Sequence, residues 1–235
     1  MNLELQRMKV GKGLILGISI CATFFTLNGC KKEYLQIKPI SSSDKSHEEP
    51  VVHPVVKADS LPCGGFRTQT QGGWGAIPHG NNPGKYMQDH FAGAFPNGLT
   101  VGCTYKLTLT SAQAVTNYLP AGGSPAVLKI DYTNPTTLKN NLASQLVTLT
   151  LSVQFDFYDP QYSSSNTLLG SLTIGSGPFQ GMTVSAFLTE ANKVLGGCPS
   201  SYTAAQISDV LTAINENFVD GSKNGGFLIC SGGIN

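Results

Sequence analysis

The chain has 235 residues, with 15 Lys and Arg against 14 Asp and Glu and a formal net charge of +1 at pH 7. This length accommodates one domain of ordinary size with extensions, and the balanced charge argues against a nucleic-acid-binding protein, which needs a clustered basic face. Charged residues make up only 12% of the chain, below the usual quarter, and Gly, Ser, Thr and Asn fill the difference, a composition common in secreted and cell-surface proteins.

The first thirty residues have the pattern of a secretory signal. An apolar run, GLILGISICATFFTL at residues 13–27, is too short for a comfortable membrane span. A positive region precedes it, formed by Arg7, Lys9 and Lys12. Residues 27–30 read LNGC, which resembles the bacterial lipobox, in which a small residue precedes the cysteine that becomes the lipidated N-terminus. We therefore expect a signal peptide over residues 1–29 and lipidation of Cys30; the alternative is an uncleaved anchor with a chance cysteine.

Residues 30–62 have the composition of a tether. They contain several prolines and the polar run SSSDKSHEEP, and they show no strong apolar period. Such a segment buries too little apolar surface to fold, so we expect an extended, lipid-anchored spacer. The folded part of the chain then covers residues 63–235, as one extracytoplasmic globular module.

Four cysteines remain once Cys21 leaves with the signal and Cys30 carries lipid: Cys63, Cys103, Cys198 and Cys230. An even number of cysteines in an oxidising compartment predicts two disulfide bonds. Zinc is the competing interpretation, but no two of these cysteines have the spacing of two to four residues that is usual for zinc ligands. We expect no metal and no cofactor. Three pairings of four cysteines exist, and these residues alone leave the choice open.

The first predicted elements of the module are a strand and a short helix. Residues 104–110 (TYKLTLT) alternate between apolar and polar side chains, which predicts a strand. Ser111 then has the position of a helix cap, and Pro120 closes the helix that we expect over residues 112–119.

Residues 138–157 are ambiguous between helix and strand. Leucines recur there at helical spacing, but the second half of the segment also alternates as a strand would. We favour the helix, because its period spans more turns and no breaker occurs between Pro135 and Pro160. The β-branched and aromatic residues at the end of the segment argue for the strand.

Two clearer helices follow. Thr183 begins one, and a pair of glycines ends it. Thr203 begins the other with Gln206 in the position of a capping box, and Gly221 is the expected stop. Residues 227–230 (FLIC) are a candidate strand. Together these elements predict a mainly α, single compact disulfide-stabilised domain with a few short strands; the alternative is an α+β or β-sandwich-like fold.

The stretch FRTQTQGGWG holds Trp74, the only tryptophan of the chain. Residues 70–74 (TQGGW) resemble the T-Q-G-x-W opening of a cysteine-framed module of secreted bacterial proteins. Residues 142–155 (LASQLVTLTLSVQF) resemble the central helix of that module, and Cys63 and Cys230 stand where its framing cysteines do. The motifs TQTQGGWG and INENFVDG are also similar to those of surface proteins from bacteria of the Bacteroidota type. After Trp74 the chain departs from the family, which usually continues with a basic, histidine-containing run.

The resemblance implies an extracellular accessory role. The module has no established activity, so no catalytic residue is carried over from it. Because the framing cysteines of the family lie at the two ends of the module, the resemblance implies the nested pairing Cys63–Cys230 with Cys103–Cys198. The sequential pairing, Cys63–Cys103 with Cys198–Cys230, is the rival.

Trp74 has two interpretations. With Tyr86 as a helper, its ring could stack on a sugar or an aromatic ligand. As a core residue it would pack against the helices, and the glycines beside it would let the backbone approach closely. We favour the structural role and keep Trp74 and Tyr86 as a candidate stacking site.

Few residues of the module suggest catalysis. His79 and His90 do not have the spacing of a metalloprotease helix, and we expect both to be surface or hydrogen-bonded histidines. Asp156 and Asp159 are expected to be solvated loop carboxylates, rather than a glycosidase pair or the start of a calcium loop. The sequence therefore predicts no catalytic residue.

The function predicted from these observations is that of a non-enzymatic module for binding, adhesion or envelope structure. We expect it at the bacterial outer membrane or cell surface, held in the bilayer by acyl chains on Cys30. A glycan or a surface protein is the candidate partner, and nucleic acid is not. The alternative is a secreted enzyme or accessory domain that acts on polysaccharide, but converging acid–base residues are scarce in the chain.

Overall fold

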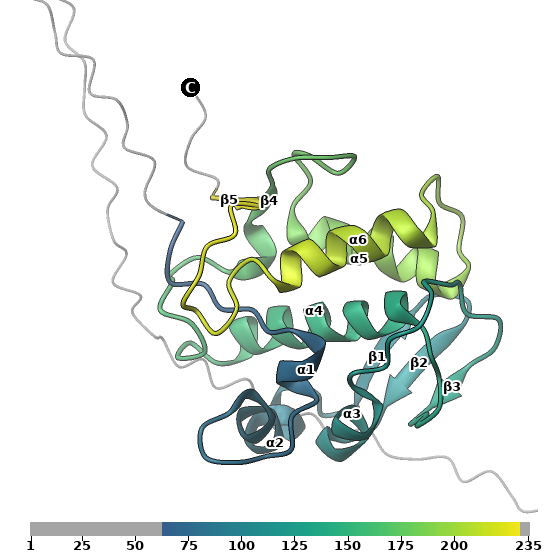
Figure 1. Ribbon diagram of the computed structural model, residues 1–235, viewed down its shortest axis with the longest axis horizontal. Coiled ribbons are helices and arrows are strands. Elements are labelled where there is room, and N and C mark those ends of the chain that lie inside the picture. The colour runs from purple at the N-terminus through teal and green to yellow at the C-terminus, as the bar shows by residue number, and fades with distance from the viewer. Residues whose placement is uncertain (1–62, 231–235) are drawn as a thin grey trace, which may run out of the picture. The chain divides into compact units, whose positions relative to one another are not determined.

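The computed structural model describes residues 63–230 (Figure 1). The expected signal peptide, the lipidation site at Cys30 and the expected tether lie outside the described residues, as do residues 231–235. The described part is mainly α-helical with a few short strands, which confirms the predicted fold class. Between residues 63 and 230, no helix is long and apolar enough to cross a membrane.

One long helix forms the centre of the domain, and shorter helices surround it. In chain order the helices are α1 (Gln71–Trp74), α2 (Pro83–Ala94), α3 (Ala112–Tyr118), α4 (Asn141–Tyr158), α5 (Val184–Gly196) and α6 (Ala204–Asn215), with the 3-10 turn η1 (Leu169–Ser171) after α4. Figure 1 shows α4 in the middle, with α5 and α6 on one side and α1, α2 and α3 on the other.

The ambiguous segment is a helix, as favoured from the sequence. Asn140 caps α4 by accepting a hydrogen bond from the Ala143 amide. The helix is buried on nearly all sides, between the other helices and β1. A helix that is enclosed all round has apolar residues all round. The same positions therefore satisfied a helical and an alternating period in the sequence.

Two small sheets complete the domain. The first has the order β1-β2-β3, formed by β1 (Leu99–Gly102), β2 (Lys106–Leu109) and β3 (Tyr132–Thr133). In it, β1 runs antiparallel to β2 with Leu99 opposite Leu109, and β3 runs parallel to β2. The second sheet pairs β4 (Thr173–Ile174) with β5 (Leu228–Ile229). Both predicted strands are confirmed, although β2 and β5 are shorter than the segments proposed for them.

The expected helix caps are present. Ser111, Thr183 and Thr203 each accept a hydrogen bond from a backbone amide in the first turn of the helix that follows. The capping box between Thr203 and Gln206 is complete. The stop at Gly221 is wrong, because α6 already ends at Asn215 and the chain turns there.

Helix α2 was not predicted. Met87, Phe91 and Ala94 recur at helical spacing, but the segment also contains one proline and two glycines, which weaken the helical signal. Tertiary packing against α1, α3 and α4 stabilises it instead.

Both disulfide bonds are present and nested. Cys63 is bonded to Cys230, which joins the two ends of the described domain. Cys103, in the turn between β1 and β2, is bonded to Cys198, just after α5. The prediction of two disulfides is confirmed, and the pairing is the one that the family resemblance implied.

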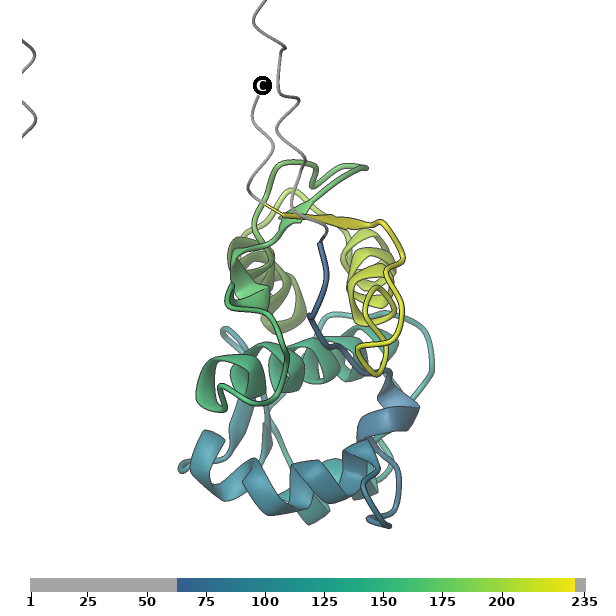
Figure 2. The ribbon, with the colours of Figure 1, turned by 90° about the vertical axis from the view of Figure 1, so that its left-hand side faces the viewer.

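The N-terminal and C-terminal segments of the domain lie side by side (Figure 2). The Thr68 amide donates to the Phe218 carbonyl, and the Asp220 amide donates to the Thr68 carbonyl. The rings of Phe66 and Phe218 pack 5.3 Å apart between their centroids. These contacts place the TQTQGGW motif next to the residues that follow α6.

Candidate functional site

Trp74 lies in the core, with an exposed fraction of 0%. It ends α1, which Thr70 caps by accepting a hydrogen bond from the Gly73 amide. The indole Nε1 donates to Ser152 Oγ on α4 at 3.3 Å. Its ring packs against Phe155, with the centroids 5.3 Å apart, and near Tyr162. The ring is therefore enclosed by protein and offers no face to a ligand from solvent.

Tyr86, the other half of the candidate stacking site, is also occupied by protein groups. Its hydroxyl donates to Asp159 Oδ2 at 2.7 Å, and the His90 ring stacks on it with the centroids 4.2 Å apart. The Arg67 guanidinium lies 5.8 Å from its ring centroid. Burial, and then the hydrogen bond to Asp159, raises the pKa of Tyr86. Trp74 is a core residue and the half-buried Tyr86 packs against the core, so the two rings do not form an open platform.

The prediction that Asp156 is a solvated carboxylate is wrong. Asp156 has an exposed fraction of only 6%, because the chain after α4 folds back over it. Its carboxylate accepts hydrogen bonds from the Ser163 hydroxyl at 2.8 Å and from the Leu169 amide at 2.6 Å. Asp156 thus fastens the start of η1 to the end of α4.

Asp159 is half-buried and accepts hydrogen bonds from the Tyr86 hydroxyl and the Gln161 amide. It is engaged within the fold and is not the solvated carboxylate that the sequence suggested. Within residues 63–230, no group of three or more metal-ligating side chains comes together.

The remaining candidates lie apart from Trp74. His79 is exposed in the loop before α2. Asp89 is exposed on α2, where it forms an ion pair with Lys85. Neither residue converges with the buried indole, so these side chains do not form one site.

The amides of the motif are used in the fold. Gln69 donates to the Asp220 carboxylate at 2.9 Å, and Gln71 donates to Asn141 Oδ1 at 3.0 Å. Gln71 also accepts a hydrogen bond from the Ala121 amide. The motif therefore joins the N-terminal segment to the start of α4 and to the residues after α6.

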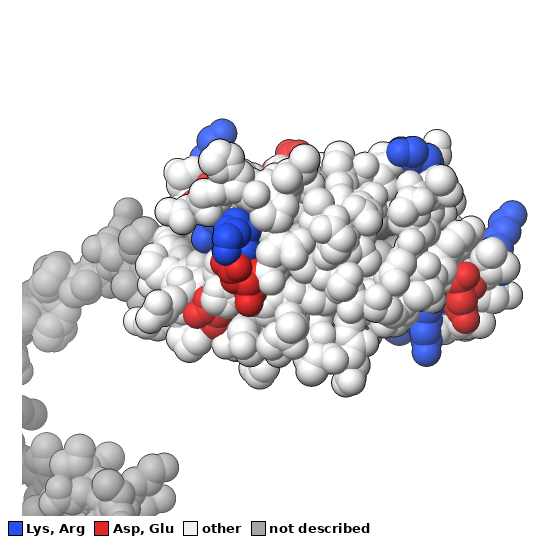
Figure 3. Space-filling view, turned by 90° about the horizontal axis from the view of Figure 1, so that it is seen from below, with Lys and Arg blue, Asp and Glu red and all other residues white. Residues whose placement is uncertain are grey.

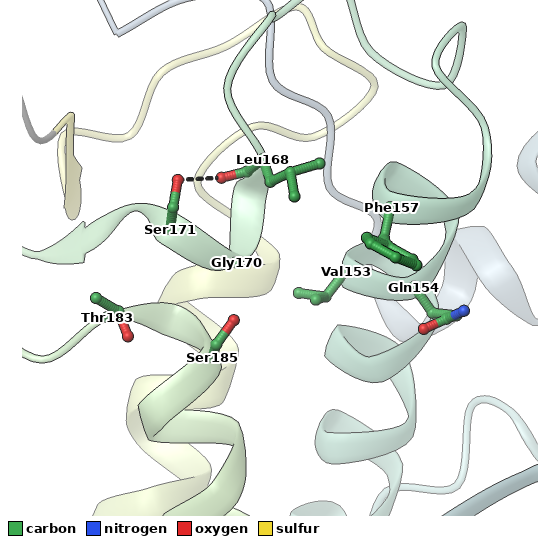
Figure 4. Close-up of a pocket in the computed structure, with 8 residues that line it drawn as sticks. All are labelled: Val153, Gln154, Phe157, Leu168, Gly170, Ser171, Thr183 and Ser185. Atoms are coloured by element: carbon green, nitrogen blue, oxygen red, sulfur yellow. Dashed lines mark hydrogen bonds between the residues drawn. The ribbon is translucent and has the colours of Figure 1, made fainter. Parts of the chain in front are cut away.

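The feature of the structure best suited to binding is a pocket that the sequence analysis did not find. It has a volume of ≈ 500 Å³, within the range of about 300–1,000 Å³ that small-molecule sites occupy. It lies between the C-terminal end of α4, η1 and the start of α5 (Figure 4). The lining residues are Val153, Gln154, Phe157, Leu168, Gly170, Ser171, Thr183 and Ser185.

Two large apolar side chains at this pocket are open to solvent. Phe157 is 69% exposed and Leu168 is 48% exposed. Figure 4 shows Val153 and Phe157 on α4, with Ser171, Thr183 and Ser185 across the gap. The only signal in the sequence was the apolar pair Phe155 and Phe157 near the end of a helix. One of them had to point outward, but which one depends on the path of residues 159–168.

Comparison of the chain with protein-family models, with curated proteins and with solved structures gave no significant match. The site is therefore described by its own geometry.

Proposed function

We propose that this protein is a non-enzymatic binding module of the bacterial envelope. The observation that carries the proposal is the pocket at the end of α4, with Phe157 and Leu168 exposed at its rim. Exposed apolar side chains that gather around a concavity mark binding sites more often than scattered ones do. Other large apolar side chains of the described domain, such as Ile77, are also exposed, but Phe157 and Leu168 are exposed at the same pocket.

The setting of the pocket supports this proposal. Asp156, next to Phe157, binds the Leu169 amide, which fixes the rim relative to α4. The two disulfides close the domain at its ends and at the first sheet. The walls of a pocket on such a constrained domain are already ordered, so they lose little conformational entropy when a ligand binds.

The location that we propose is the outer membrane or the cell surface, with acyl chains on Cys30 in the bilayer. The lipobox-like LNGC and the preceding apolar run support the anchor. Disulfide bonds are typical of proteins outside the cytosol, which supports export. Figure 3 shows few charged side chains on the face that it presents, with blue and red groups in contact and no large patch of one sign. On this face, charge therefore does not point to a highly charged partner.

The binding proposal is tested with 4-fluorobenzyl alcohol, a neutral, water-soluble probe, and the full-length protein in lipid nanodiscs. We expect the ¹⁹F line of the probe to be broader with the protein than with empty nanodiscs. Phe157→Ala should return the line to the width seen with empty nanodiscs, because it removes the largest exposed apolar wall. Ile77→Ala is the matched control, since Ile77 is 80% exposed and does not line the pocket. Equal broadening by both variants, or none by the unaltered protein, contradicts the proposal.

The alternative of a polysaccharide-degrading enzyme is tested on the same preparation. We expect neutral polysaccharides incubated with the protein to keep their chain length, as measured by the release of reducing ends. Release that Phe157→Ala abolishes would replace the binding proposal with an enzymatic one.

A further inference from the structure

The two sides of the pocket differ in chemistry. Val153 and Phe157, on α4, form an apolar wall. Across from them, Thr183 and Ser185 present hydroxyls from the start of α5 (Figure 4). None of the eight lining residues carries a charge. The pocket therefore suits a neutral molecule with one apolar face and one hydroxyl-bearing edge.

The hydroxyl wall retains hydrogen-bonding capacity. Thr183 Oγ1 accepts a hydrogen bond from the Ala186 amide as the cap of α5, which leaves its hydroxyl proton to donate. The Ser185 hydroxyl makes no hydrogen bond to another residue within the described range 63–230. Ser185 can therefore both donate to and accept from a ligand.

The amide of Gln154 is engaged elsewhere. Its nitrogen donates to the Ala94 carbonyl on α2 at 3.1 Å, and in Figure 4 the side chain points away from Thr183 and Ser185. The polar contacts open to a ligand thus lie on the α5 side, opposite the aromatic ring.

Gly170 keeps the space between the walls open. A Cβ atom at this position would lie 2.5 Å from Ser185 Oγ and 3.6 Å from Val153 Cγ1. Any side chain here would enter the gap between α4 and α5 and displace the Ser185 hydroxyl. The floor of the pocket therefore depends on the absence of a side chain at this residue.

We propose that this pocket binds a neutral saccharide of one or two sugar rings, an inference that rests on the proposed binding function. The C–H face of a sugar ring matches the Phe157 ring, and its hydroxyls match Thr183 and Ser185. A wholly apolar ligand that covered both hydroxyls would leave the Ser185 hydroxyl without a partner and the Thr183 hydroxyl proton without an acceptor. An unsatisfied buried polar group costs about 1–3 kcal/mol. A charged ligand would find no countercharge among the lining residues.

The experiment is saturation-transfer NMR on the full-length protein in nanodiscs. The ligands are neutral disaccharides of the common hexoses, with glucuronic acid as the charged comparison. We expect transfer to a neutral disaccharide, strongest at the ring protons of one face. Phe157→Ala should abolish the transfer and Ser185→Ala should weaken binding about 5–10-fold. Phe157→Trp should retain binding, because it keeps an aromatic face, and Ile77→Ala should leave it unchanged.

Phe157→Leu separates a saccharide from a merely apolar ligand. It keeps apolar area but removes the aromatic face. The variant should therefore lose saccharide binding, but it should still broaden the ¹⁹F line of 4-fluorobenzyl alcohol. If the probe binds but no neutral disaccharide does, or if glucuronic acid alone binds, the saccharide inference is overturned and the binding function stands. If neither the probe nor any saccharide binds, both proposals fall.

Discussion

The indole of Trp74 is enclosed by side chains of α2, of α4 and of the segment after α4. Its removal should therefore lower the free energy of unfolding measurably. Trp74→Ala should lower the free energy of unfolding by about 3–5 kcal/mol, the usual range for a buried large aromatic residue. Urea denaturation followed by circular dichroism measures it. Phe157→Ala is the matched control, since its ring is 69% exposed, and it should change stability by less than about 1 kcal/mol. Similar losses in the two variants would show that Trp74 is not part of the core.

The tyrosines near Trp74 predict a loss of stability at alkaline pH. Burial raises the pKa of Tyr162, and burial with the hydrogen bond to Asp159 raises that of Tyr86. The folded protein therefore keeps these protons, whereas the unfolded chain releases them above about pH 10. The free energy of unfolding should be unaffected by these groups below pH 10 and should decrease above it.

Tyr162→Phe gives the corresponding measurement. Its stability should fall less steeply between pH 10 and 11.5 than that of the unaltered protein, by up to about 1.4 kcal/mol per pH unit. Urea unfolding at several pH values in this range provides the slopes. Parallel slopes for the two proteins would contradict the role assigned to Tyr162.

At the scale of single residues, the sequence indicated the role of Trp74 but not that of Asp156. A lone tryptophan among glycines is most often buried, because its large apolar surface favours burial. A carboxylate near the end of a helix is most often solvated, and only the return of residues 163–169 over α4 buries Asp156. That return is a tertiary event without a local signal. The position of Phe157 at the pocket was missed for the same reason.

At the scale of the elements, the contact between α5 and the first sheet depends on Gly196. A Cβ atom there would lie 2.7 Å from Cys103 Cα and closer still to the Cys103 amide nitrogen. Both are backbone atoms held by the Cys103–Cys198 bond, so they cannot move aside easily. Gly196→Ala should therefore destabilise the domain by about 1–3 kcal/mol or more, as overpacking does.

Gly72→Ala is the matched control for that substitution. Gly72 is also in a helix, and the nearest atom to its added Cβ lies 3.9 Å away. Thermal unfolding of the two variants should show a clear decrease in melting temperature only for Gly196→Ala. A larger decrease for Gly72→Ala would mean that the helix–sheet contact is not as described.

The elements that the sequence predicted are those with local signals. The caps at Ser111, Thr183 and Thr203 could be predicted because short polar side chains accept hydrogen bonds from the free amides in the first turn of a helix. Helix α2 was missed because its stability comes from packing rather than from propensity. For α4, the sequence showed two periods at once, and only burial on all sides explains why both were present.

At the scale of the whole molecule, the anchor can be tested directly. Cys30→Ser should move the protein from the detergent phase to the aqueous phase, or leave it with an uncleaved signal, because it removes the thiol that we propose carries the lipid. Phase separation of cell extracts with mass measurement of the product shows which occurs. A Cys30→Ser protein that still enters the detergent phase after removal of residues 1–29 would contradict lipidation.

The number of disulfides was predictable from the cysteine count. The pocket was not, because its residues come from three elements that meet only in the folded domain. Val153 and Ser185 both line the pocket, and Gly170, which has no side chain, lies between them. No repeating pattern in the sequence links these positions.

The outer disulfide also determines how the protein responds to a pull. A tension transmitted from residue 62 to residue 231 passes through the Cys63–Cys230 bond and bypasses the intervening fold. The sequence separation is 167 residues, so the bond keeps about 570 Å of contour length from extending, at roughly 3.4 Å per residue. In a single-molecule stretching experiment the oxidised domain should behave as a short inextensible link, and only a reductant should release the hidden length. As long as the bond is oxidised, the domain should keep its pocket intact under a shear force that unfolds domains without such a disulfide.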